Sequence, residues 1–273
     1  MTDVDGVEGT RWELLPDGEI RLSYPEISTM SIRNGDEIVI ETPGESEPNY
    51  VRHLISGLGM GLILHQRGFF TLHASVVAVG DFAIGIAGAK RSGKSTTAAM
   101  LADLGHRLLS DDVLAVDLRN GGPLSVLAGM PTVNLWPDSV IAVGRDPESL
   151  PKIWSEGTKR VTPVSAEQSR SAYPLSDIFF LEPLETIEQP SLEPLSAAEA
   201  IPLLIGNSHV LRLVEDRETM PIHLTQCADL TERVRLHRLK RPLALDSIRA
   251  VAALIEEQVG IRSRQPAAAT GIR

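Results

Sequence analysis

The stretch GIAGAKRSGKSTTAAMLADLGHRLLSDD, from Gly85 to Asp112, contains the pattern that decides the fold. Within it, residues 88–95 fit G-x-x-x-x-G-K-S, and we call this segment the glycine loop. The loop follows an apolar run and precedes an amphipathic segment, the strand–loop–helix order in which such a loop binds phosphate. Backbone N–H groups left open at Gly88 and Gly93 would hold the β-phosphate, together with the positive end of the helix. The sequence therefore predicts an α/β protein that binds a nucleoside triphosphate.

Two side chains of the glycine loop have predicted contacts of their own. Lys94 would reach the β- and γ-phosphates, and Ser95 would offer a hydroxyl to Mg²⁺, an ion that prefers oxygen ligands. Lys90 and Arg91 either add charge to the site or are solvated surface residues. The predicted nucleotide-binding residues are Gly88, Ala89, Lys90, Arg91, Ser92, Gly93, Lys94, Ser95 and Thr96.

A pair of acids, Asp111 and Asp112, follows the apolar run HRLL. At the end of a core strand one such carboxylate can hold a metal ion, and its neighbour can accept a proton from an attacking hydroxyl. A turn with two aspartates is an equally ordinary explanation. His73 begins the strand before the glycine loop, where it could neighbour the acids, although a lone histidine of this kind is more often structural. These three residues and Lys94 are the candidate catalytic residues.

Composition limits the classes of function. The chain has 273 residues, of which 42% are hydrophobic, so it can bury a substantial core. Its formal net charge of −10 argues against a nucleic-acid partner, because phosphate-backbone binding needs clustered Lys and Arg. Cys227 is the one cysteine, so an intrachain disulfide is impossible. The polar N-terminus and the interruption of the apolar run around residue 63 by His65 and Arg67 predict a cytoplasmic protein with no membrane partner.

The N-terminal part, residues 1–62, is predicted to be strand-rich, with strands at IRLSY, MSI and EIVIE separated by turn residues. Apolar residues between 50 and 66 have helical spacing, which interior glycines interrupt. The runs LHASVVAV and FAIGIAG flank Gly80-Asp81 and predict an antiparallel hairpin that leads into the glycine loop. The short strands near residues 20–41 would offer an edge to an extended peptide.

Residues 63–261 are predicted to form a nucleotide-binding catalytic domain of mixed α/β type. The helix after the glycine loop would end at Gly105, and HRLLS, VLAVD and PLSVLAG would be strands, with RNGG as a turn. Residues 132–163 contain four prolines and predict short helices and loops that serve as an active-site flap. The run SDIFFLEPL predicts a core strand. Ser196 and Glu199 predict a capping box at the start of a helix that ends at Gly206. Asp246 is predicted to cap a last helix. Residues 262–273 would be a disordered tail.

Five separated stretches carry a resemblance to a known family: GLILHQRG, TLHAS, GAKRSGKST, LGHRLLSDDV and LWPDS. In this order they resemble the catalytic domain of HPr kinase/phosphorylase, and more closely the HPr-kinase-like serine kinases encoded beside lasso-peptide biosynthesis genes. The likeness covers about residues 62–181. It implies a phosphoenolpyruvate-carboxykinase-like nucleotide fold with a phosphate loop, like the C-terminal domain of HPr kinase. It also implies transfer of the γ-phosphate of ATP, with Mg²⁺, to a serine of a peptide or protein, with a lasso-peptide precursor as a candidate acceptor.

The resemblance assigns roles residue by residue. Lys94 and Ser95 match the phosphate and magnesium contacts, Asp111 the general base, Asp112 its neighbour on the metal side, and His73 the histidine beside them. The division of roles between the two aspartates stays open. Lys159 and Arg160 are candidates for a clamp on the γ-phosphate, the alternative being a solvated surface pair.

The sequence departs from the HPr enzymes at two places. Ala74 follows His73 where those enzymes have glycine, and PTVNLWPDS, with Asp138 as its one acid, stands where they have a glutamate and a glycine-rich signature. Phosphorolysis and HPr as acceptor are therefore not carried over. HPr kinases assemble as hexamers, which raises a homo-oligomer for this chain as well. The rival interpretations are a nucleotide-gated binding or scaffold protein without transfer, and a small-molecule kinase.

Overall fold

The computed structural model describes residues 10–45, 47–119, 123–130, 132–164, 172–209 and 219–263. Its N-terminal part is an antiparallel sheet of four strands in sequence order: β1 (Arg11–Leu14), β2 (Ile20–Tyr24), β3 (Ser28–Arg33) and β4 (Glu37–Glu41). The prediction of a strand-rich region is confirmed. The prediction missed β1, because its sequence RWEL has little of the apolar alternation that marks a strand.

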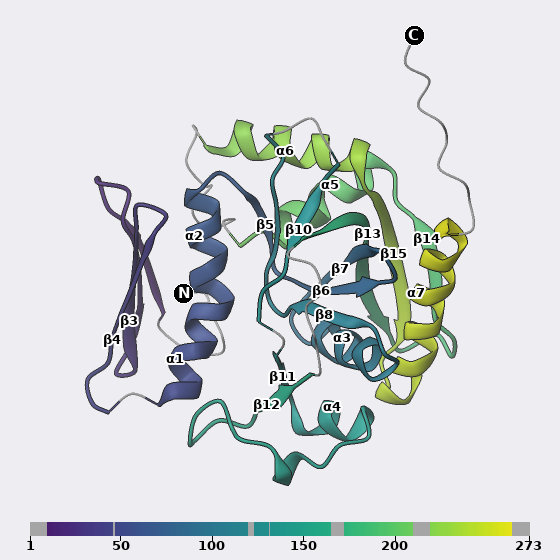
Figure 1. Cartoon of the computed structure of the whole chain (residues 1–273), viewed down its shortest axis with the longest axis horizontal. Coiled ribbons are helices and arrows are strands. Elements are labelled where there is room, and N and C mark those ends of the chain that lie inside the picture. Colours follow the sequence, from purple (N-terminus) through teal and green to yellow (C-terminus); the bar gives the residue numbers. More distant parts are fainter. Residues whose placement is uncertain are drawn as a thin grey trace.

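A kinked helix lies between this sheet and the rest of the chain (Figure 1). It comprises α1 (Pro48–Leu54), a π-helical turn η1 (Ile55–Gly59) and α2 (Met60–Gln66). The expected helix is therefore present, and the kink falls at Gly57, whose φ of −91° and ψ of −106° are not helical. Leu54, Leu62 and Ile63 pack against the apolar face of the N-terminal sheet. The predicted boundary at residue 62 falls inside α2 and stays a prediction.

The central element is a mixed sheet of nine strands. Seven follow one another across it: β5 (Phe70–Leu72), β9 (Leu114–Val116), β10 (Ser125–Leu127), β13 (Ala172–Leu184), β7 (Phe82–Gly88), β6 (Ala74–Val79) and β8 (Arg107–Ser110). The long strand β13 also pairs with β15 (Arg235–Pro242), which in turn pairs with β14 (Ser191–Pro194). β13 runs parallel to β7 and β15, whereas the other pairs are antiparallel. The α/β class with a mixed sheet and the β6–β7 hairpin are confirmed.

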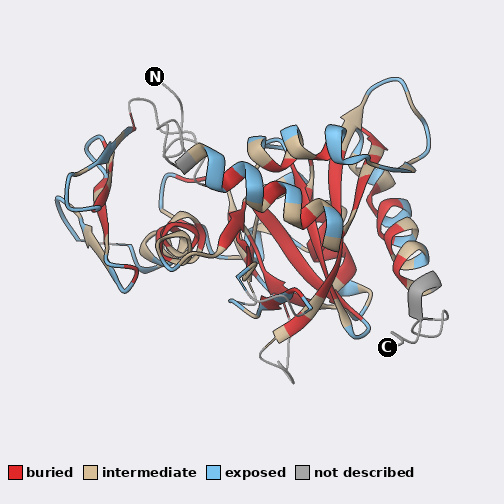
Figure 2. Ribbon diagram, turned by 90° about the horizontal axis from the view of Figure 1, so that it is seen from above, coloured by how far each residue is buried: buried red, intermediate tan, exposed pale blue. Residues whose placement is uncertain are grey.

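Helices cover both faces of this sheet (Figure 1). Side chains of one face, such as Ile178 and Phe180 of β13, pack with α5 (Ala197–Gly206) and α6 (Thr219–Arg233). The alternating residues Phe179 and Leu181 pack on the other face with α3 (Lys94–Asp103) and α7 (Ile248–Ser263). The strands are accordingly buried along much of their length, while the helices expose their outer sides (Figure 2). No helix in the described part of the chain is long and apolar enough to cross a membrane.

Residues 132–163, which we call the flap segment, lie beside α3. They contain β11 (Thr132–Leu135), α4 (Pro137–Ala142), a 3-10 turn η2 (Pro147–Ser149) and β12 (Arg160–Pro163). The short helices were predicted, but the antiparallel pairing of β11 with β12 was not. These strands are separated by more than 20 residues, and local patterns carry no signal for such pairing.

The remaining sequence predictions can be compared one by one. Gly105 ends α3 with a φ of +97°, and Ser196 and Glu199 form the expected capping box of α5. Asp246 lies in a 3-10 turn, η3 (Leu245–Ser247), which has no side-chain cap. Helix α7 extends through Ser263, so the predicted tail begins later than residue 262, and residues 264–273 lie outside the described residues. Residues 120–122 of the predicted RNGG turn also lie outside them.

Candidate functional site

The glycine loop connects the end of β7 to the first turn of α3, and its backbone requires glycine at two positions. Gly88 and Gly93 have φ values of +142° and +102°. A Cβ on Gly88 would lie 2.8 Å from the carbonyl oxygen of Leu181 and from Oγ of Ser92, closer than atoms can approach. Lys94 is buried and folds back over the loop, where Nζ donates to the carbonyl oxygens of Gly88 (2.8 Å) and Ala89 (3.1 Å).

Asp111 meets the glycine loop directly. It follows β8, and β8 pairs with β6, so the acid arrives beside Ser75. Asp111 Oδ1 accepts hydrogen bonds from Ser75 Oγ (2.7 Å) and Ser95 Oγ (3.1 Å), and Oδ2 accepts one from the backbone N–H of Asn134 (3.2 Å). The fold thus brings together Ser95 and Asp111, as the sequence predicted, and adds Ser75 and Asn134, which the sequence analysis did not single out.

The two aspartates have opposite electrostatic surroundings. Burial and the negative charge of Asp112 raise the pKa of Asp111 to about 6, against the hydrogen bonds from Ser75, Asn134 and Ser95. Burial alone would raise the pKa of the Asp112 carboxyl, but its electrostatic interactions with His73, His53, Lys159 and His209 lower it overall. Burial also lowers the pKa of Lys94, which both acids oppose. The site therefore pairs an Asp112 whose pKa lies below the ordinary carboxyl value with an Asp111 whose pKa lies above it.

Three histidines lie around Asp112, which has a left-handed backbone (φ +71°) that costs free energy in a residue other than glycine. Its carbonyl oxygen accepts hydrogen bonds from His73 Nδ1 (3.3 Å) and His209 Nε2 (2.6 Å). His73 Nδ1 also lies 3.8 Å from Asp112 Oδ1. His73 thus lies beside Asp112, and His73 and His209 both contact the backbone carbonyl of this residue.

A short segment after α5, Asn207–His209, connects three parts of the site, and we call it the clip. The Asn207 side-chain oxygen accepts from the N–H of Gly88 (3.0 Å), where the glycine loop begins. The Asn207 carbonyl accepts from the N–H of His73 (2.7 Å), and His209 binds Asp112 as described. The sequence GNSH contains no catalytic motif, so sequence reasoning missed the clip. The pairing of Ser208 with Leu72 of β5 is one of the contacts that place it here.

The kinked helix also reaches the acids. His53 of α1 contacts Asn134 through Nδ1 (3.1 Å from the amide nitrogen), and Asn134 in turn holds Asp111. At the π-helical turn, a Cβ on Gly57 would lie 3.6 Å from Asp112 Oδ2. The kinked helix therefore forms one wall of the site. The sequence analysis assigned this part of the chain to a strand-rich region and did not predict that it contributes to the site.

Other predicted site residues differ in position. Lys159 of the flap segment lies near Asp112 and Lys94. Its Nζ lies 5.6 Å from the centroid of the Trp136 ring, and the guanidinium of Arg91, from the glycine loop, lies 5.1 Å from the same centroid. Arg160 is instead buried within the flap segment, where its guanidinium donates to the carbonyls of Pro147 and Thr158 and to Glu148. The structure thus does not bring Arg160 to the acids.

Within the glycine loop, the side chains of Ala89 and Lys90 are exposed. Thr96 is buried, and its Oγ1 donates to Ser139 Oγ of α4 (3.0 Å), so its side chain fixes α3 to the flap segment.

No family model matches this sequence, and no curated protein matches it. Among solved structures, one that matches is the HPr(Ser) kinase/phosphatase from Coxiella burnetii, with 14% identity and a TM-score of 0.37. The match covers 71% of this chain and 95% of that chain.

The residues present fit a magnesium–nucleotide group. The donors gathered at the loop are oxygens, from the Ser95 hydroxyl and the carboxylates of Asp111 and Asp112, and Mg²⁺ prefers such ligands. Ser95 donates its one proton to Asp111, so its lone pairs are left for a cation. Ser95 and Asp112 would hold the ion, and Lys94 with the loop N–H groups would hold the phosphates.

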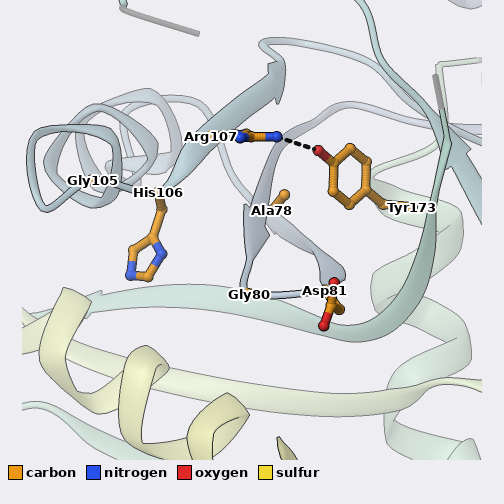
Figure 3. A pocket seen from close by; sticks show the side chains of 7 residues that line it. All are labelled: Ala78, Gly80, Asp81, Gly105, His106, Arg107 and Tyr173. Carbon is orange, nitrogen blue, oxygen red and sulfur yellow. Dashed lines mark hydrogen bonds between the residues drawn. The ribbon is translucent and has the colours of Figure 1, made fainter. Parts of the chain in front are cut away.

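A cavity of about 310 Å³ lies at the other end of β7, where the turn Gly80-Asp81 begins this strand (Figure 3). Its lining includes the acid Asp81 and the base Arg107. Arg107 donates to the hydroxyl of Tyr173 (3.1 Å), and His106 pairs with Glu256 (2.8 Å). We therefore place the candidate site at the glycine loop.

Proposed function

We propose that this protein transfers the γ-phosphoryl group of ATP to a serine hydroxyl of a peptide or protein. The observation that carries the proposal is the 3.1 Å contact between Ser95 of the glycine loop and the carboxylate of Asp111. Because loops of this type bind the β- and γ-phosphates, the acid would share one site with the terminal phosphoryl group. A protein that only binds nucleotide has no need of two adjacent carboxylates at this place, one buried (Asp111) and one half-buried (Asp112).

The chain's own residues would position the nucleotide. The open backbone at Gly88 and Gly93 would present N–H groups to the phosphates, and Lys94 would exchange its bonds to the Gly88 and Ala89 carbonyls for phosphate oxygens. Mg²⁺, when bound, would neutralise charge on the same oxygens. Lys159 of the flap segment, which lies near Asp112, would add a positive charge.

In the reaction, the serine oxygen of the acceptor would form a bond to the γ-phosphorus. The bond from that phosphorus to the bridging oxygen would break, so that ADP leaves. The hydroxyl proton would pass to Asp111, whose pKa of about 6 suits a base at neutral pH. Asp112 would stay ionised beside the cation.

The peptide acceptor would approach along the N-terminal part of the molecule. β1 and β4 are the two edges of the N-terminal sheet, and an extended peptide adds to such an edge through main-chain hydrogen bonds. The Gly57 kink would then lead the acceptor serine towards Asp112. A lasso-peptide precursor is one acceptor of this kind.

The test is to incubate the protein with Mg-ATP and the peptide encoded beside its gene, and to weigh the peptide by mass spectrometry. We expect a phosphopeptide with wild type and none with Asp111→Asn, which still binds ATP in calorimetry. A scaffold protein would bind ATP and leave the peptide unchanged, and a small-molecule kinase would consume ATP only with a small alcohol. Unchanged phosphorylation by Asp111→Asn would contradict the assigned role of the acid.

A further inference from the structure

Arg241, at the end of β15, lies fully buried against the back of the glycine loop. Only 1% of its surface is exposed, which makes it one of the largest fully buried side chains of the protein. Its Nε donates to the carbonyl oxygen of Ser92 at 2.9 Å, inside the loop. Its Nη1 donates to the carbonyl oxygens of Pro242 (2.7 Å), Ala244 (3.3 Å) and Leu243 (3.5 Å).

No carboxylate pairs with this guanidinium among the residues that the structure describes, since its hydrogen bonds there go to neutral carbonyl groups. Burial without a counter-charge is costly, and buried arginines are usually paired with an acid or a bound anion. By contrast, Arg238 on the same strand lies 3.4 Å from Glu182, and Arg235 lies 2.9 Å from Asp177. The unpaired charge is thus the one beside the loop.

The geometry also couples Arg241 to the direction of the loop's peptide groups. In a planar trans peptide the C=O and N–H bonds point in opposite directions. Because the Ser92 carbonyl points to Arg241, the N–H of Gly93 points away from it. A Cβ on Gly93 would lie 3.2 Å from Nε and Nη2 of Arg241, so glycine is needed here both for its positive φ and for the close approach of the guanidinium.

We propose that Arg241 is a positioning residue for the triphosphate, which it serves as counter-charge from behind the loop. It fixes the Ser92–Gly93 peptide with the Gly93 N–H directed to the phosphates, and it adds a permanent positive potential that the bound polyphosphate neutralises. The inference rests on the nucleotide site of the proposed function and is independent of phosphoryl transfer.

The test compares binding of ATP, ADP and AMP by calorimetry in wild type, Arg241→Met and Arg241→Lys. We expect Arg241→Met to weaken ATP binding roughly tenfold, ADP less and AMP least, because the lost attraction scales with ligand charge. Arg241→Lys keeps the positive charge and should therefore recover most of the affinity for ATP that Arg241→Met loses. Arg238→Met is the matched control, because it removes a partly exposed charge from the same strand. It should weaken the binding of all three nucleotides only slightly and to the same extent.

If Arg241 had a structural role alone, Arg241→Met would lose affinity for ATP, ADP and AMP by the same factor. This result would overturn the proposal. Should Arg241→Met fail to fold, the three affinities of Arg241→Lys are compared with those of wild type. Nearly unchanged affinities support the counter-charge, and an equal loss of affinity for ATP, ADP and AMP overturns it. A wild type that binds ATP without phosphorylating any peptide would sink the proposed function and leave this inference standing. A wild type that binds no nucleotide would overturn both.

Discussion

One residue of the candidate site lies in an environment that is unfavourable for its charge. Asp111 is buried beside a second carboxylate, so its ionisation is unfavourable in the folded protein even with three hydrogen bonds. Such a group is typical of a reactive site, where a base must not be too weak at neutral pH.

Asp111→Asn should therefore stabilise the metal-free protein at neutral pH. The folded-state pKa of about 6 lies above the ordinary 3.8, so ionisation costs the folded state free energy that grows as pH rises from about 4 to 6. In EDTA at pH 7.5 we expect a gain on the order of 1–2 kcal/mol in urea unfolding, which disappears near pH 4.5. A loss of stability at pH 7.5 would contradict the assignment.

Gly57 leaves room beside Asp112 that a side chain would fill. Gly57→Ala places its methyl in ordinary contact with Asp112 Oδ2, whereas Gly57→Val adds two more methyl groups near the carboxylate. We expect a graded loss of kcat, at least tenfold for valine, with ATP affinity nearly unchanged. Thermal unfolding of the free variants is the control. Equal kcat values in wild type and Gly57→Val would show that the π-helical turn does not border the reacting groups.

At this scale the sequence revealed the residues that lie close together along the chain. Lys94 and Ser95 belong to one motif, and Asp111 follows after a short helix and strand, so pattern and spacing were enough to predict them. Asn134, His53 and His209 come from distant segments and carry no motif, so only tertiary packing brings them to the acids. Arg241 was not predicted for the same reason, because the sequence of β15, RLHRLKRP, is rich in basic residues and resembles an exposed segment.

At the scale of elements, the clip after α5 ties the glycine loop to the acids. Asn207 holds the first N–H of the loop and His209 holds the carbonyl of Asp112, so one segment of chain supports two different functions.

The two ends of the clip should give different kinetic effects. Asn207→Leu removes the acceptor for Gly88 and should raise the KM for ATP several-fold with a smaller change in kcat. His209→Ala removes a donor to Asp112 and should lower kcat about tenfold with KM nearly unchanged, while His209→Gln, which keeps an N–H donor, should recover part of the rate. Steady-state kinetics at saturating acceptor separates the two. Identical effects of both substitutions on one parameter would show that the clip acts only on overall stability.

A second connection joins the kinked helix to the flap segment. Glu47 accepts two hydrogen bonds from Ser155 (2.7 Å each), Asn49 donates to the carbonyl of Lys152 (3.1 Å), and Tyr50 packs edge-on against Trp154 (5.7 Å). The sequence predicted the short helices of this segment from its prolines. It did not predict these contacts, nor α6, β14 or β15, because the burial of β15 depends on neighbours far away in the sequence.

At the scale of the whole molecule, the N-terminal sheet has its own apolar cluster and its own charged cluster. Glu19 is nearly buried and accepts hydrogen bonds from Arg33 (2.6 Å), Ser31 (2.9 Å) and Arg21 (2.7 Å). These bonds, that from Arg33 foremost, lower the pKa of Glu19 to about 2.

This charged cluster should make the N-terminal sheet sensitive to acid. The folded-state pKa of about 2 lies below the ordinary 4.5, so the stabilisation is complete above pH 4.5 and is lost as pH falls towards 2. We expect Glu19→Gln to unfold at lower urea concentration than wild type at pH 6, with the gap closing between pH 4.5 and 2. A gap that stays constant over this range would mean that the Glu19 charge does not contribute.

The central claim is that the glycine loop, Lys94 and the paired acids act on one nucleotide. A crystal structure with Mg²⁺ and a non-hydrolysable ATP analogue tests it most directly. The account predicts the β- and γ-phosphates within hydrogen-bonding distance of Lys94 and the loop N–H groups, with the ion on Ser95 and the γ-phosphate facing Asp111. A triphosphate bound elsewhere, or one whose terminal phosphate points away from both aspartates, would contradict it.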